Sequence, residues 1–166
     1  VTYENNTFVA VGYSGTILTS SDGTTWTSRT SGTSNQLKGA TFGNNTFLAV
    51  GDSGTILTSS DNGTSWTVRT PAKSEVVNGI TFGNNTFVTW GYSGTLQTSS
   101  DNGTSWTWHE TNIGAELGAG TFGNGVFVLK SRDYGYTLRS TDNGTSWSVD
   151  RDYQLSCGSS VTVLTY

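Results

Sequence analysis

The sequence repeats itself with a period of about 40 residues. A phenylalanine recurs at intervals of 39, 40 and 40 residues, and a tryptophan recurs at intervals of 40, 40 and 41. The phenylalanines are Phe8, Phe47, Phe87 and Phe127, and the tryptophans are Trp26, Trp66, Trp106 and Trp147. A period of this length, with strand-forming residues inside each unit, is typical of propeller blades and of β-solenoids. The repeat therefore restricts the fold to architectures in which similar units pack side by side along the chain.

The second repeat indicates how a single unit folds. Alternating apolar and polar residues predict strands at 38–42, 46–50, 55–59 and 65–70, separated by turns rich in Gly, Asn and Asp. Four antiparallel strands joined by tight hairpins make one propeller blade, whereas solenoid coils of this length usually carry a helix or shorter strands. Small residues such as Gly39, Gly79 and Gly120 occupy the innermost strand, which suits a narrow axis and few blades. We predict an all-β fold, a β-propeller of four-stranded antiparallel blades, with a four-bladed ring as the first choice.

The repeat also predicts the blade boundaries within a single domain, 1–166. The blades span about 1–37, 38–77, 78–117 and 118–157, and 158–166 form a surplus innermost strand at the C-terminal end. Residues 1–3 already align with an innermost strand, so four blades have five candidates for that place. The extra strand closes the ring, belongs to a longer array, or exchanges with a neighbouring molecule. The sequence leaves these three possibilities open.

Composition excludes several classes of partner and cofactor. The net charge of −4 argues against the phosphate backbone of a nucleic acid as a partner. No stretch approaches 18 uninterrupted apolar residues, so we expect no membrane span. A single cysteine, Cys157, excludes an intramolecular disulfide and a cysteine-based zinc cluster. No cofactor is expected.

A second motif lies inside the repeat, at the predicted turn between the third and fourth strands. The pattern Ser-x-Asp-x-Gly-x-x-Trp occurs at 59–66, 99–106 and 140–147, and the copy at 20–26 is one residue shorter. It resembles the Asp-box, or bacterial-neuraminidase repeat, of sialidase-type β-propellers. Non-enzymatic propellers, including photosystem II assembly factors and many secreted repeat proteins, carry it too. The resemblance covers all four units and implies a hairpin in each blade, but no particular reaction.

We predict a structural role for this motif. The Asp carboxylate can accept hydrogen bonds from backbone N–H groups of its own turn, and Gly supplies a positive φ. The Trp ring is then buried between neighbouring units. The residues concerned are Asp22, Trp26, Asp61, Gly63, Trp66, Asp101, Gly103, Trp106, Asp142, Gly144 and Trp147. One carboxylate per unit is too few for calcium, so no metal site is expected.

The sequence does not favour an enzyme. The sialidase resemblance would imply an arginine triad, a Tyr nucleophile assisted by Glu, and an acid–base Asp. Arg29 and Arg69 share one position of the repeat, which later units fill with His109 and Asp150, so they do not form a convergent triad. His109 is the only histidine and has no Ser or Cys nucleophile motif nearby. A sialidase-like glycosidase is therefore the least favoured function.

Variation among the repeats is confined to one predicted face. The turns after the first and third strands are nearly uniform, whereas the turns after the second strand and the connections between blades differ in length and chemistry. Variation within one chain indicates the face that is free to specialise. The candidate ligand-binding residues are Tyr13, Asp52, Tyr92, Arg132, Asp133, Tyr134 and, at the repeat position of Arg29 and Arg69, His109. The tyrosine rings suit stacking on sugars or protein surfaces, and the alternative is that they only cover strand ends.

The first functional hypothesis is a non-catalytic extracellular propeller for glycan or protein recognition or adhesion. Low charge, few lysines and abundant Thr, Ser, Asn and Gly suggest a secreted or cell-surface protein. The second hypothesis is a structural subunit of a surface layer or filament, assembled through self-association of terminal strands. Six Asn-x-Thr sequons are explained by turn chemistry and would be glycan acceptors in a secretory setting.

Overall fold

The structure is a computed structural model in which residues 1–151 are described. It contains four antiparallel sheets, each with four strands in sequence order. The first sheet comprises β1 (Thr2–Glu4), β2 (Thr7–Val11), β3 (Ile17–Ser20) and β4 (Thr27–Arg29), and the second comprises β5 (Leu37–Gly43), β6 (Thr46–Gly51), β7 (Ile56–Ser59) and β8 (Thr67–Arg69). The third comprises β9 (Val77–Gly83), β10 (Thr86–Gly91), β11 (Leu96–Ser99) and β12 (Thr107–Trp108), and the fourth comprises β13 (Leu117–Gly123), β14 (Val126–Ser131), β15 (Tyr136–Ser140) and β16 (Ser148–Arg151). The prediction of four four-stranded antiparallel blades is confirmed, while the predicted surplus strand at 158–166 lies outside the described residues.

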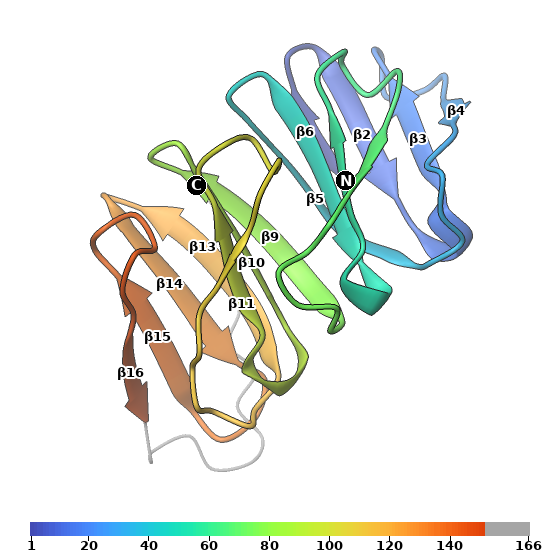
Figure 1. Cartoon of the computed structure of the whole chain (residues 1–166). Coiled ribbons are helices and arrows are strands. Elements are labelled where there is room, and N and C mark those ends of the chain that lie inside the picture. The colour runs from blue at the N-terminus through green and yellow to red at the C-terminus, as the bar shows by residue number, and fades with distance from the viewer. Residues whose placement is uncertain (152–166) are drawn as a thin grey trace.

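The blades follow one another along an open arc, with the first sheet at one end and the fourth at the other (Figure 1). The innermost strands β5, β9 and β13 are neighbours along this arc. The four-bladed ring that the small inner residues suggested is not closed among residues 1–151. Small residues permit inner strands to approach closely, but they do not fix the angle between blades, which depends on the side chains packed between the sheets.

The hydrophobic core lies between blades, in three separate clusters. Between the first and second blades, Val9 and Ile17 pack against Phe47 and Leu57. The second interface joins Leu48, Val50 and Ile56 to Val77 and Phe87, and the third joins Val88, Trp90 and Leu96 to Phe127, Leu129 and Leu138. Because each cluster is shared by two blades, a single blade has no complete core of its own.

Each interface has an aromatic half and a largely aliphatic half, to which Trp90 of the third blade is the exception. The later blade supplies the aromatic half, which consists of a ring on its first strand, a Phe on its second strand and the motif Trp; in the second blade these are Phe42, Phe47 and Trp66. The two rings of one blade are paired in register, with centroids 4.6 Å apart for Phe42 and Phe47. The earlier blade supplies aliphatic side chains such as Val9 and Ile17.

The turn between the third and fourth strands of each blade, here called the Asp turn, is held by its own side chains. In the second blade, Asp61 Oδ1 accepts hydrogen bonds from Ser59 Oγ at 2.7 Å and from the Ser65 N–H at 2.9 Å. The Gly63 N–H donates to Ser59 Oγ at 2.9 Å, and Trp66 Nε1 donates to the Gly63 carbonyl at 3.0 Å. Gly63 has a φ of 75°, which is the left-handed conformation predicted for that position.

Asparagines link each blade to the Asp turn of the next one. Asn5, Asn44 and Asn84, in the turns between first and second strands, donate to Asn62, Asn102 and Asn143 at 2.6, 3.2 and 3.0 Å respectively. These turns and the Asp turns therefore lie on the same edge of the arc. The opposite edge carries the turns between second and third strands.

Candidate recognition face

The turns between second and third strands share one backbone shape in the first three blades. They form the short 3-10 turns η1 (Tyr13–Gly15), η2 (Asp52–Gly54) and η3 (Tyr92–Gly94). Their central serines have φ values of 52° to 55°, which bends the chain sharply and turns the first residue outward. In the fourth blade the left-handed residue is Tyr134, with a φ of 68°.

Backbone hydrogen bonds tie these turns to the connections between blades. The Asp52 N–H donates to the Gln36 carbonyl at 2.9 Å, and the Arg132 N–H donates to the Glu116 carbonyl at 2.8 Å. The Tyr92 N–H makes the equivalent bond to Val76 at 3.0 Å. The variable turns and the ends of the variable connections therefore lie together, and we call this edge the recognition face.

Three tyrosines of the recognition face are open to solvent. Tyr13 is 76% exposed, Tyr92 is 45% exposed and Tyr134 is 67% exposed. Each comes from a different blade, so the rings are distributed along the arc. The prediction that these tyrosines stand at the variable turns matches their position, and their exposure leaves the rings available for stacking.

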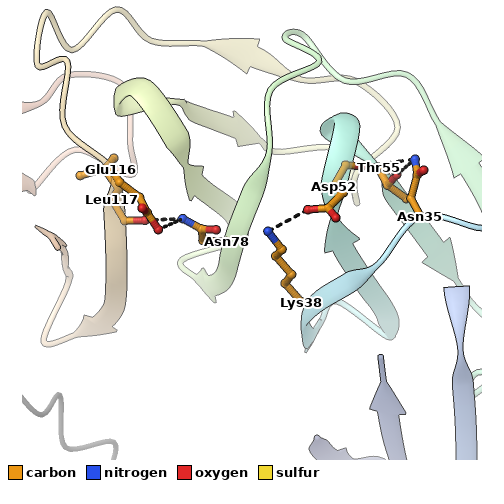
Figure 2. A network of polar contacts seen from close by, with 7 residues as sticks. All are labelled: Asn35, Lys38, Asp52, Thr55, Asn78, Glu116 and Leu117. Carbon is orange, nitrogen blue, oxygen red and sulfur yellow. Dashed lines mark hydrogen bonds and ion pairs between the residues drawn. The ribbon is translucent and has the colours of Figure 1, made fainter. Parts of the chain in front are cut away.

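A polar network runs along the same face between the second and third blades (Figure 2). Lys38 Nζ lies 2.7 Å from Asp52 Oδ1, and it also lies 5.6 Å from the centre of the Tyr92 ring. Asn35 Nδ2 donates to Thr55 Oγ1 at 2.8 Å, which braces the turn that carries Asp52. The lysine thus joins a charged pair in one blade to a cation–π contact with the next.

A second part of the network joins the third blade to the fourth. Asn78 Nδ2 donates to Glu116 Oε1 at 2.9 Å and to the Leu117 carbonyl at 3.1 Å (Figure 2). Arg132 Nε lies 3.1 Å from the same Glu116 oxygen. The arginine side chain is largely exposed, so its remaining N–H groups are accessible to a ligand.

Six of the seven candidate residues belong to the turns between second and third strands, whereas the seventh, His109, comes directly after β12. Asp133 lies in the same turn as Arg132 and Tyr134 and is exposed. His109 instead follows β12 on the outer side of the third blade, where its Nε2 lies 2.8 Å from Thr98 Oγ1. Burial lowers the pKa of His109, and the Asp142 carboxylate partly opposes this.

Sequence reasoning missed three members of the network, namely Lys38, Asn78 and Glu116. Lys38 and Asn78 occupy the second position of β5 and β9, inside strands that otherwise looked purely structural. The sequence nevertheless contains a signal for Lys38 and Asn78, because a charged or amide side chain there begins an innermost strand that otherwise consists mainly of small residues. Trp108, at the end of β12, is 40% exposed and has Lys73 Nζ 4.9 Å from the centre of its ring, whereas Trp90 belongs to the core.

A small polar cavity lies away from the recognition face, between the second and third blades. Its volume is about 210 Å³, and hydroxyl groups dominate its walls together with Arg69 and Asn102. Within residues 1–151, no three His, Cys, Asp or Glu side chains come together in a way that could hold a metal ion. The described part of the chain also contains no helix of the length and apolarity that crossing a membrane requires.

Comparison with solved structures shows what this arrangement is similar to. A structure described as YCF48 bound to D1 peptide matches with a TM-score of 0.67 and 19% identity, over 88% of this chain and 50% of that chain. YCF48 from Cyanidioschyzon merolae matches with a TM-score of 0.67 and 17% identity, over 90% of this chain and 53% of that chain. The fold is a β-propeller.

The propeller chain spans about half the length of the two YCF48 structures. A GH74 enzyme from Niastella koreensis is similar with a TM-score of 0.55 and 28% identity, over 80% of this chain but only 21% of that chain. No family model matches the sequence, and no curated protein matches it.

Proposed function

We propose that this chain is a non-catalytic propeller that binds a protein partner through its recognition face. The observation that carries the proposal is a set of exposed tyrosines, Tyr13, Tyr92 and Tyr134. They lie on the same edge as a network of positively and negatively charged side chains. Exposed aromatic rings next to arginine are the residue types that most often provide binding energy at protein interfaces.

The shape of the face favours an extended polypeptide segment. The rings and the polar network are spread over consecutive blades, which suits a partner that runs along the arc more than a compact ligand in a deep cavity. Lys38, Glu116 and Arg132 offer hydrogen-bonding groups of both charges for backbone amides and side chains. One similar propeller, YCF48, has been solved with a bound peptide, which supports this class of partner.

The proposal is tested by selecting binders from a random peptide display library against the 166-residue chain. The affinity of the selected peptides is then measured for the wild type and for Tyr92→Ala. Loss of the ring should weaken binding roughly tenfold or more, because Tyr92 lies at the centre of the face. Val68→Ala, on the exposed outer strand β8, is the matched control and should leave the affinity unchanged. Equal affinities for Tyr92→Ala and wild type would contradict the proposal.

Glycan recognition is the second candidate, because flat tyrosine rings beside Asp52 and Arg132 also suit a sugar surface. A glycan array probed with the same protein variants separates the two. Array signals that Tyr92→Ala abolishes, with no peptide selected from the library, would replace the protein partner by a glycan.

We further propose that the Asp turns are Asp boxes of the sialidase-like repeat superfamily and that this member has no catalytic activity. The repeated Ser, Asp, Gly and Trp contacts support the first statement. The second is supported by the sequence, in which His109 has no Ser or Cys nucleophile motif nearby. Hydrolysis of a fluorogenic sialoside by the purified chain would contradict the absence of catalysis. The low charge and hydroxyl-rich composition support an extracellular or cell-surface location. Fractionation of cells that express the native gene tests this location.

A further inference from the structure

The first blade has an aromatic half-interface that no described residue covers. Its members are Tyr3, Phe8 and Trp26, which are equivalent to Phe42, Phe47 and Trp66 of the second blade. Tyr3 is 50% exposed and Trp26 is 38% exposed, and Phe8 is only partly buried although the equivalent Phe47, Phe87 and Phe127 are fully buried. We call this surface the trailing face.

The fourth blade has the opposite half-interface, which likewise has no neighbour among residues 1–151. A Cβ added at Gly43 would collide with the ring of Phe82 in the next blade, and one added at Gly83 would collide with Phe122. Gly123 is the equivalent glycine of the fourth blade, yet it is exposed and no described atom lies within 4 Å of a Cβ placed there. Gly123 is therefore an empty socket for an aromatic ring on what we call the leading face.

The register of the repeat identifies which ring fits this socket. Phe82 is paired with Phe87 across its hairpin, and Tyr3 is paired with Phe8 in the same way. The rings of Tyr3 and Phe8 lie 4.3 Å apart, compared with 4.5 Å for Phe82 and Phe87. Among residues 1–151, Tyr3 is thus the aromatic ring that has the right position in its blade but no neighbouring blade to enter.

The charges of the two end faces are complementary. Lys130 and Arg139 stand on the leading face, where the second blade has Val50 and Thr58. Thr58 borders Gly103 in the Asp turn of the next blade, so Arg139 would border the Asp turn of a docked blade. On the trailing face that turn contains Asp22, and the exposed Glu4 lies beside Tyr3.

We propose that the leading face of this chain docks on the trailing face of a second copy, with Tyr3 of one copy in the Gly123 socket of the other. Because each copy carries both faces, two copies satisfy both contacts at once and close the arc. A ring made of two copies would be about as long as one YCF48 chain, since the region that matches this chain covers 50% and 53% of the two YCF48 chains. The proposal is independent of what the recognition face binds.

The test is the mass of the 166-residue chain in solution, measured by light scattering over a concentration series. The expected mass is twice 17.6 kDa. Gly123→Leu should raise the dissociation constant roughly tenfold or more, because the side chain blocks the socket, while a Cβ at this position has no described atom within 4 Å. Gly114→Leu is the matched control, since that exposed glycine also has nothing within 4 Å and no left-handed φ, and it should remain dimeric.

Tyr3→Ala provides a second variant on the opposite face and should weaken the dimer in the same way. A wild-type chain that remains monomeric at all concentrations would overturn the proposal. So would assemblies that keep growing with concentration, which would indicate an open filament, or a dimer that withstands both Gly123→Leu and Tyr3→Ala.

Discussion

The aspartates of the Asp turns show how a single exposed residue can stabilise a hairpin. The Ser65 hydroxyl and then the Ser65 N–H are the main groups that lower the pKa of Asp61 to about 2, and Ser146 acts in the same way on Asp142, also with a pKa of about 2. Partial burial raises the pKa of Asp101, but hydrogen bonds from Ser105 and Ser99 outweigh it and leave the pKa at about 2. All three carboxylates are therefore bound more tightly as anions than as neutral acids.

Stability should consequently fall in acid. A carboxylate whose pKa is about 2 when folded and about 4 when unfolded stabilises the fold above pH 4 or so, and this contribution is lost as the pH falls towards 2. Urea denaturation measured between about pH 5 and pH 2 should show that the urea concentration at the unfolding midpoint falls as the pH is lowered. Asp61→Asn should lower stability at neutral pH by about 1 kcal/mol, as loss of a local cap does, and should flatten part of the acid slope. A pH slope identical in Asp61→Asn and wild type would contradict this role.

At the scale of strands and turns, the sequence predicted most of the architecture because the constraints are local. Alternation and turn residues placed the second blade's strands within a residue or two of β5, β6, β7 and β8. The exposure of Tyr92 and the network around Lys38 could not be predicted, since both depend on how one blade lies against the next. The open arc was missed for the same reason, because small residues such as Gly79 fix a contact distance but not the angle between sheets.

Glycines at the end of each innermost strand give a direct test of packing between blades. Gly83→Ala should destabilise the protein by about 1–3 kcal/mol, because its Cβ would overlap the ring of Phe122. Gly83 does not have a left-handed φ, so this clash is the only cost that the substitution is expected to carry. Gly123→Ala, at the same position of the repeat, should change stability little because no described atom lies within 4 Å of its Cβ. Chemical denaturation of both variants as monomers measures the difference. Equal losses would mean that backbone freedom, and not the ring in the socket, determines the need for glycine.

Across the whole molecule, stability depends on neighbouring blades and has a direction. The Asp turns of the second, third and fourth blades pack against the preceding blade. A Cβ at Gly63 would touch Thr19 and Val9, and one at Gly144 would touch Thr98. The first Asp turn has no preceding blade among the described residues, and a Cβ at Gly23 would meet only Phe8 of its own blade. In a linear array of this kind, local opening is easiest where a neighbour is missing.

Amide hydrogen exchange should reveal this direction. The N–H groups of Gly23, Gly63, Gly103 and Gly144 all donate to the serine of their own turn, so each turn provides one equivalent amide, although the first turn is one residue shorter. In dilute monomer, the Gly23 amide should exchange fastest. The Gly144 amide should stay protected, although its blade is also at an end of the arc, because its turn packs against Thr98 of the third blade. Raising the concentration should protect Gly23 selectively if a second copy covers the trailing face. Fast exchange at both Gly23 and Gly144 would instead indicate that both ends fray alike, and that the side on which a neighbour lies has no effect on the turn.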